Sequence, residues 1–145
     1  MVYKNIVAVT LLFFGSALVA FGQAPLKVLI VDGQNNHVQW PKITYMLKEY
    51  MEETNMFSVD VARSAYTWKG EEYLVEFIVE GVGETTALEE PKSDPNFAPD
   101  FSEYDAVICN FGWNAAPWPA ETQQAFEKYM EEGGGLVVFH ADYNS

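Results

Sequence analysis

The fold of this chain is constrained most by a set of short apolar runs, each followed by polar residues. Residues 27–31 form a β-branched apolar run with no alternation of polar residues, and residues 106–109 and 136–139 form two similar runs. Strands that are apolar on both sides are typical of a parallel sheet covered by helices on both faces. Residues 57–62 instead alternate apolar and polar side chains, which predicts a further strand nearer the sheet edge.

Two amphipathic helices separate these strands. Residues 41–54 begin with proline, which the first helical turn accepts, and their apolar residues recur at helical spacing. Pro119 opens the second helix, and the glycines at 133–135 end it. Residues 72–78 indicate a short helix with an acidic face, and residues 84–99 an extended surface connection. We therefore expect an α/β fold, a doubly wound, mostly parallel, flavodoxin-like sheet of four strands.

Composition and charge exclude several classes of protein. The chain is 49% hydrophobic, which is typical of a globular domain and not of a disordered tail. Its 8 basic and 21 acidic residues give a net charge of −13, which makes nucleic acid an unsuitable partner. Cys109 is the single cysteine, so no intramolecular disulfide forms, and its apolar neighbours favour a buried thiol over a nucleophile.

Residues 1–22 have the pattern of a secretory signal peptide. One positive charge precedes an apolar run at residues 6–14, and small residues favour cleavage before Gln23. The alternative, an uncleaved membrane anchor, needs about 20 apolar residues, which is longer than this run. We expect residues 23–145 to be a single exported domain, periplasmic or extracellular, without stable membrane insertion after cleavage.

Polar and aromatic side chains follow the predicted strands. In doubly wound sheets, ligands bind at the carboxyl ends of the strands, near the point where the strand order reverses. Tryptophan faces beside amide groups suit a polar ring such as a sugar, although tryptophans near a helix start also serve for packing. The candidate substrate-binding residues are Asp32, Asn35, Asn36, Trp40, Asn110, Trp113, Trp118 and Asp142.

His37 and His140 are the only two histidines, and both follow strands whose ends the fold would bring together. We predict a catalytic or substrate-contacting role for both, with Asp32 or Asp142 orienting the imidazole. A divalent metal held by these side chains is an alternative, and histidines that only brace their own loops are another. No other cofactor is predicted. A histidine at the position of a nucleophile elbow disfavours covalent catalysis by serine or cysteine there.

Four segments resemble the ThuA-like, or trehalose-utilisation, domain family: residues 27–37, 104–107, 118–123 and 133–141. The family belongs to the class I glutamine amidotransferase-like superfamily but lacks the amidotransferase cysteine, in agreement with His140. The resemblance implies a flavodoxin-like fold and a small-molecule carbohydrate as partner, in the use of trehalose or a related disaccharide or keto-sugar. It makes no prediction about oligomeric state.

The resemblance also implies which residues line a cleft, and it has departures. The family's cleft positions correspond to Asn36, His37, Trp40, Asn110 and His140. Many members carry His-Asp-Trp where this chain has His37-Val38-Gln39-Trp40, so an acidic neighbour to His37 is missing. Family domains continue beyond the last predicted strand, so we expect residues 23–145 to be a partial domain, incomplete at its C-terminus.

Three functions follow as hypotheses. The first is an exported ThuA-like protein that binds or processes a sugar at the carboxyl ends of the strands. The second is a non-catalytic carbohydrate-binding accessory module, in which the tryptophans bind and the histidines brace loops. The third is a metal-dependent hydrolase.

Overall fold

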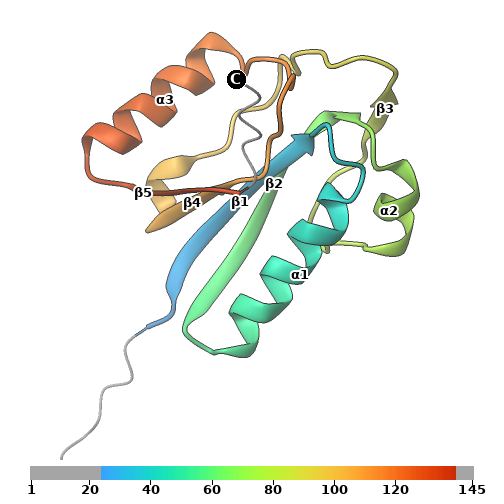
Figure 1. Ribbon diagram of the computed structural model, residues 1–145. Helices are drawn as coiled ribbons and strands as arrows, with labels where there is room; N and C mark the ends of the chain where they lie inside the picture. The colour runs from blue at the N-terminus through green and yellow to red at the C-terminus, as the bar shows by residue number, and fades with distance from the viewer. Residues whose placement is uncertain (1–23, 140–145) are drawn as a thin grey trace, which may run out of the picture.

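A single parallel sheet forms the centre of the molecule. The computed structural model describes residues 24–139, so the predicted signal peptide, His140 and Asp142 lie outside the described residues. Five strands pair in the order β3-β2-β1-β4-β5, all parallel (Figure 1). The elements are β1 (Leu26–Gln34), α1 (Trp40–Glu53), β2 (Phe57–Trp68), α2 (Glu71–Glu76), β3 (Thr86–Leu88), the 3-10 turn η1 (Phe101–Glu103), β4 (Ala106–Cys109), α3 (Ala120–Glu131) and β5 (Gly135–Val138).

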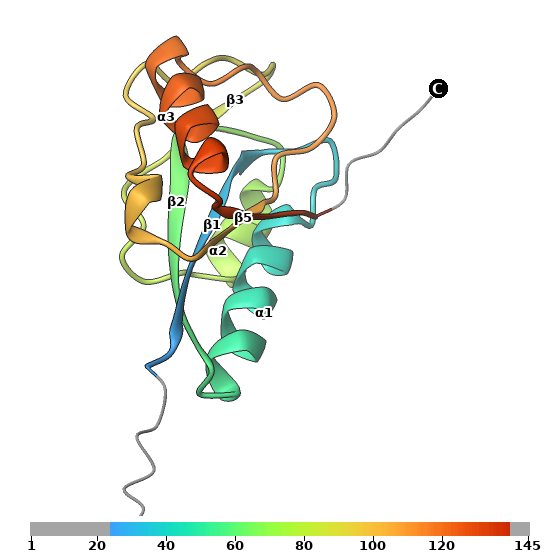
Figure 2. The ribbon, with the colours of Figure 1, turned by 90° about the vertical axis from the view of Figure 1, so that its left-hand side faces the viewer.

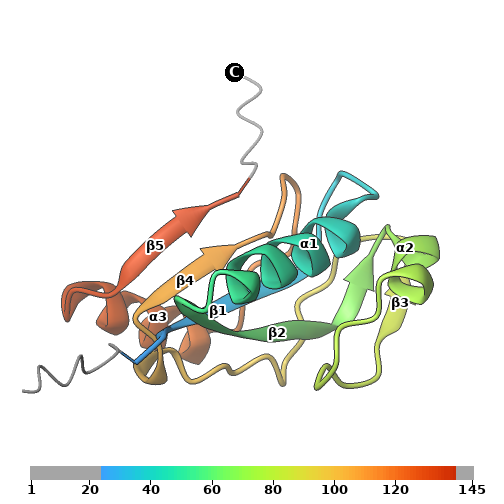
Figure 3. The same ribbon diagram turned by 90° about the horizontal axis from the view of Figure 1, so that it is seen from below.

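Helices cover both faces of the sheet, with α1 on one face and α3 on the other (Figures 2 and 3). Side chains of β1 alternate between these two layers. Val28 and Ile30 join a buried cluster on the α1 side, and Leu29 and Val31 join another on the α3 side. All four are at most 3% exposed, so the predicted central strand buried on both faces is confirmed.

β2 and β3 differ from the sequence-based expectation. β2 extends to Trp68, well beyond the predicted end at residue 62. Residues 86–88, expected in a surface connection, form a fifth strand that pairs with the last three residues of β2. Three residues are too few to show a period, so a strand of this length leaves no pattern in the sequence.

The chain order places the strand reversal beside β1. From β1 the chain moves outward through β2 and β3, and then crosses to β4 on the other side of β1. The carboxyl ends of β1 and β4 therefore flank the position where doubly wound folds bind ligands. Among the described helices, none combines the length and the apolar character that crossing a bilayer requires.

Candidate functional site

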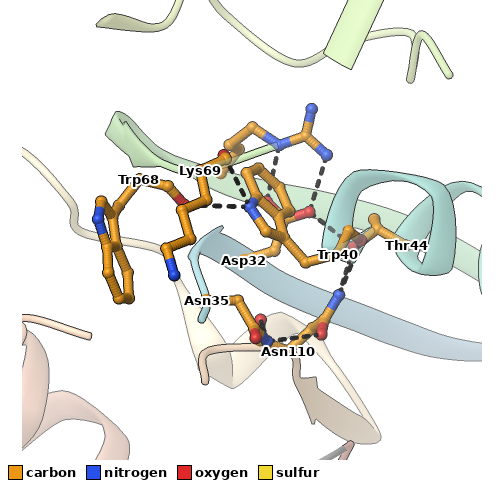
Figure 4. A network of polar contacts seen from close by, with 8 residues as sticks. Asp32, Asn35, Trp40, Thr44, Trp68, Lys69 and Asn110 are labelled. Atoms are coloured by element: carbon orange, nitrogen blue, oxygen red, sulfur yellow. Dashed lines mark hydrogen bonds and ion pairs between the residues drawn. The ribbon is translucent and has the colours of Figure 1, made fainter. Parts of the chain in front are cut away.

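Asp32, at the carboxyl end of β1, is fully buried and engaged (Figure 4). The Arg63 guanidinium donates from Nε to Oδ1 at 2.8 Å and from Nη2 to Oδ2 at 2.7 Å. The Thr44 hydroxyl of α1 donates to Oδ2 at 2.7 Å. A bidentate pair with a third donor satisfies the carboxylate, so Asp32 supports the site from beneath and has no surface for a ligand.

Asn110, at the end of β4, continues this network across the reversal point. Its Nδ2 donates to the Thr44 hydroxyl at 2.9 Å and to the Trp40 carbonyl at 3.1 Å. Its backbone oxygen and Oδ1 accept from Asn35 Nδ2 at 3.3 and 3.4 Å. Asn35 Oδ1 in turn accepts from the His37 backbone N–H at 2.9 Å. The fully buried amides therefore hold the loop that carries His37 against the end of β4.

Trp40 begins α1 and is fully buried. Its Nε1 donates to the backbone oxygens of Trp68 at 3.3 Å and Lys69 at 3.1 Å, and the Arg63 guanidinium lies 4.9 Å from its ring centroid. Trp40 thus joins the start of α1 to the end of β2. Covered on these sides, its ring supports the loops and is not exposed for stacking on a sugar.

Asn36 and His37 are half-buried in the loop after β1. Asn36 Oδ1 has no hydrogen-bond partner within residues 24–139. A Cβ at Gly112 would lie 2.3 Å from Asn35 Oδ1 and 2.6 Å from Asn36 Oδ1, so only glycine allows this approach between the loops. β4 separates β1 from β5, the strand that leads to His140. The predicted meeting of the two histidines falls outside the described residues.

The two tryptophans of the β4–α3 loop have different surroundings. Trp113 is 59% exposed, so its ring is available to a ligand. Trp118 is half-buried, and its ring centroid lies 5.5–5.9 Å from those of four phenylalanines, Phe97, Phe101, Phe111 and Phe126. Trp118 therefore packs α3 and η1 onto the sheet, which is the packing role considered for it above.

An open hollow of about 540 Å³ lies at the carboxyl ends of the strands, and we call it the rim hollow. Its lining joins the end of β2, the segment after β3 and the β4–α3 loop. The lining residues are Trp68, Glu89, Glu90, Pro91, Asn114, Ala115, Ala116 and Pro117. A second hollow of about 360 Å³ shares Trp68 and Glu89 and extends toward Val38 and Lys69.

Residues 89–97, which we call the strap, form one wall of the rim hollow and are fastened at several points. Trp68 Nε1 donates to the Glu89 carbonyl at 3.2 Å, and the Ala65 N–H donates to the buried Asp94 carboxylate at 2.7 Å. The Thr122 hydroxyl donates to the Phe97 carbonyl. A wall held in this way is preformed for binding.

Sequence reasoning missed most of the rim hollow. Trp68, Glu89 and Glu90 come from the stretch where no function was predicted. Trp68 carried one usable signal, since it stands just before Lys69 and Gly70, as a residue at the carboxyl end of a strand would. Nothing in the sequence marks the two glutamates, because their position depends on the three-residue strand β3.

The described residues offer neither a reactive thiol nor a cluster of metal ligands. Burial raises the pKa of the Cys109 thiol, which keeps it neutral and poorly nucleophilic. Within residues 24–139, no group of three or more histidine, cysteine, aspartate or glutamate side chains is arranged to hold a metal ion. The predicted His140 and Asp142 are not part of that range.

No protein-family model and no curated protein matches the chain. A solved structure does match, a ThuA-like protein from Parabacteroides merdae, with a TM-score of 0.57 and 29% sequence identity. The match covers 80% of this chain and 32% of the other, so the chain spans about a third of the length of that structure. The likeness supports a ThuA-like α/β fold.

Proposed function

We propose that this chain is part of an exported ThuA-like protein of carbohydrate utilisation that binds a sugar, trehalose or a related disaccharide or keto-sugar, in the rim hollow. The observation that carries the proposal is the lining itself, a tryptophan beside two carboxylates and an amide in about 540 Å³. That volume lies within the range of about 300–1,000 Å³ found for small-molecule sites.

The lining matches the chemistry of a sugar. Trp68, the two prolines and the two alanines offer apolar surface to ring C–H groups. The carboxylates of Glu89 and Glu90 make no hydrogen bond or ion pair within the described part of the chain, so they are available to accept from sugar hydroxyls. Asn114 adds both a donor and an acceptor, and the exposed Trp113 stands next to it.

Two substitutions test the proposal without damaging the fold. Asn114 has φ of 64°, which glycine adopts freely, so Asn114→Gly removes the amide without backbone strain. Glu90→Gln removes one exposed charge. We expect each to weaken binding of trehalose about fivefold in isothermal titration calorimetry, as loss of one hydrogen bond predicts.

Asn55→Gly is the matched control, because Asn55 also has positive φ but lies in the turn after α1. It should leave the affinity unchanged. If the unaltered chain binds none of a panel of mono- and disaccharides, or if Asn55→Gly weakens binding as much as Asn114→Gly, sugar binding in the rim hollow is wrong.

A non-catalytic binding module is the second candidate, and one observation favours it: His37 does not line the rim hollow. Replacing His37 and His140 by alanine separates it from an enzyme that processes the sugar. Unchanged affinity with unchanged turnover identifies the histidines as structural. Unchanged affinity with lost turnover identifies them as catalytic, with the aspartate and asparagine network holding His37 in place.

Export is proposed from residues 1–22 alone and has its own test. N-terminal sequencing of the protein recovered outside the cytoplasm should begin at Gln23. Recovery of protein that still begins at Met1 would indicate an uncleaved anchor instead.

A further inference from the structure

Gln34, the last residue of β1, uses every hydrogen-bonding direction of its amide except one acceptor lone pair. Its Nε2 donates to the Lys92 carbonyl at 2.7 Å and to the Tyr66 carbonyl at 3.0 Å. Its Oε1 accepts from the Ala116 backbone N–H at 3.0 Å. The residue is 2% exposed, so these bonds are shielded from water and costly to break.

The three partners of this amide belong to the three walls of the rim hollow. Tyr66 precedes the lining residue Trp68 in β2, and Lys92 follows the lining segment 89–91 in the strap. Ala116 is itself part of the lining, in the β4–α3 loop. Gln34 does not line the hollow, yet it is the one side chain bonded to all three walls within the described residues.

We propose that Gln34 is a positioning residue that sets the spacing of the rim-hollow walls and thereby its affinity for sugar. This inference rests on the proposed function. Because binding to a preformed site avoids the cost of ordering its walls, loosening them lowers affinity although no contact with the ligand is lost. A glutamine suits the task, since one planar amide supplies two donors and an acceptor.

Gln34→Glu is the sharpest test. At neutral pH the carboxylate faces the Tyr66 and Lys92 carbonyl oxygens with no proton to donate, and we expect about tenfold weaker sugar binding. Burial beside carbonyl oxygens raises the pKa of such a carboxyl. On acidification it gains a proton and donates again to one carbonyl, so affinity should recover. The measured quantity is the ratio of variant to wild-type affinity at each pH, which cancels titration of Glu89 and Glu90.

Two further variants separate positioning from general stability. Gln34→Met removes all three hydrogen bonds without adding a charge, and should weaken binding at every pH with no recovery in acid; it also serves if Gln34→Glu folds poorly. Tyr129→Phe removes the bond from the Tyr129 hydroxyl to the Gly135 carbonyl, which touches none of the three walls. It should lower Tm and leave the sugar affinity unchanged at temperatures below unfolding.

Amide hydrogen exchange supplies a readout that needs no ligand. In Gln34→Glu at neutral pH, the backbone N–H groups of Glu89, Glu90 and Lys92 should exchange at least about tenfold faster than in wild type, and slow again relative to wild type in acid. The Ala116 N–H should exchange faster in Gln34→Met, which removes its acceptor. If wild type binds no sugar, the proposed function fails while exchange still decides the role of Gln34. The inference would be overturned if the amides of Gln34→Met exchanged as slowly as those of wild type. It would also be overturned if the affinity losses followed Tm in all variants, Tyr129→Phe included.

Discussion

At the scale of single residues, the Asp32–Arg63 pair is the most consequential contact. Both side chains are nearly inaccessible, at 0% and 4% exposure. A charge removed from water to this extent is stabilised only while its partner remains. The pair neutralises the one carboxylate buried at the carboxyl end of β1, so the loop after it can carry polar groups without an adjacent unpaired charge.

Arg63→Met should lower the free energy of unfolding by about 3–5 kcal/mol, because it leaves the buried Asp32 carboxylate without a counter-charge. Urea unfolding followed by tryptophan fluorescence measures the loss. Lys128→Met is the control, since the Lys128–Glu132 pair is 72% and 62% exposed and exposed pairs contribute little. A loss below about 1 kcal/mol for Arg63→Met would contradict the account of this pair.

Asp32 also shows how far residue roles could be predicted. Its place after an apolar strand correctly located it at the strand end. Its partner is 31 residues away, opposite it in the β1–β2 register. Because register depends on where both strands begin, the sequence suggested a substrate contact where the structure has a buried ion pair. Trp40 was also expected to contact substrate, but it is buried because its indole bonds to the backbone at the end of β2.

At the scale of elements, prediction succeeded where a segment carries its own signal. β1, β4 and β5 are apolar runs, and α1 and α3 have proline at or next to the first turn and apolar periodicity, so all five were expected. β3 and the second half of β2 were missed. The end of β2 is polar and aromatic. β3 pairs with that end, just before the strap that Asp94 fastens to Ala65 of β2. Such elements depend on tertiary contacts.

The approach of the loops after β1 and β4 gives an element-scale prediction. Gly112→Ala would place a methyl group 2.3 Å from Asn35 Oδ1, and Asn35 is held by Asn110 and His37. We expect a loss of about 2 kcal/mol in unfolding free energy, from overpacking. Gly83→Ala is the control, with nothing within 4 Å of its Cβ. Equal stability of the two variants by thermal denaturation would show that the loops can separate at little cost.

At the scale of the whole molecule, the net negative charge and the apolar edge strand β5 have opposite effects on self-association. Within residues 24–139, β5 is the last strand of the sheet, and Leu136, Val137 and Val138 are 40%, 51% and 52% exposed. An exposed apolar edge strand is a template for pairing with another chain. The net charge of −13 keeps copies apart until salt screens it.

We therefore expect self-association that increases with salt, measured by sedimentation velocity between low ionic strength and about 1 M, where the Debye length falls to about 3 Å. Val137→Lys places a charge on the edge and should suppress the association. Val75→Lys is the control, because Val75 is 79% exposed on α2, away from β5. Association that Val137→Lys leaves unchanged would place the contact elsewhere.

The half-buried thiol of Cys109 has a practical consequence. It is the chain's sole sulfhydryl and it resists deprotonation, so it should react only slowly with maleimide reagents in the native protein. A cysteine introduced as Ala115→Cys could then be labelled selectively with an environment-sensitive dye. The dye's emission would report whether a sugar displaces water from the rim hollow, so occupancy could be measured by fluorescence titration.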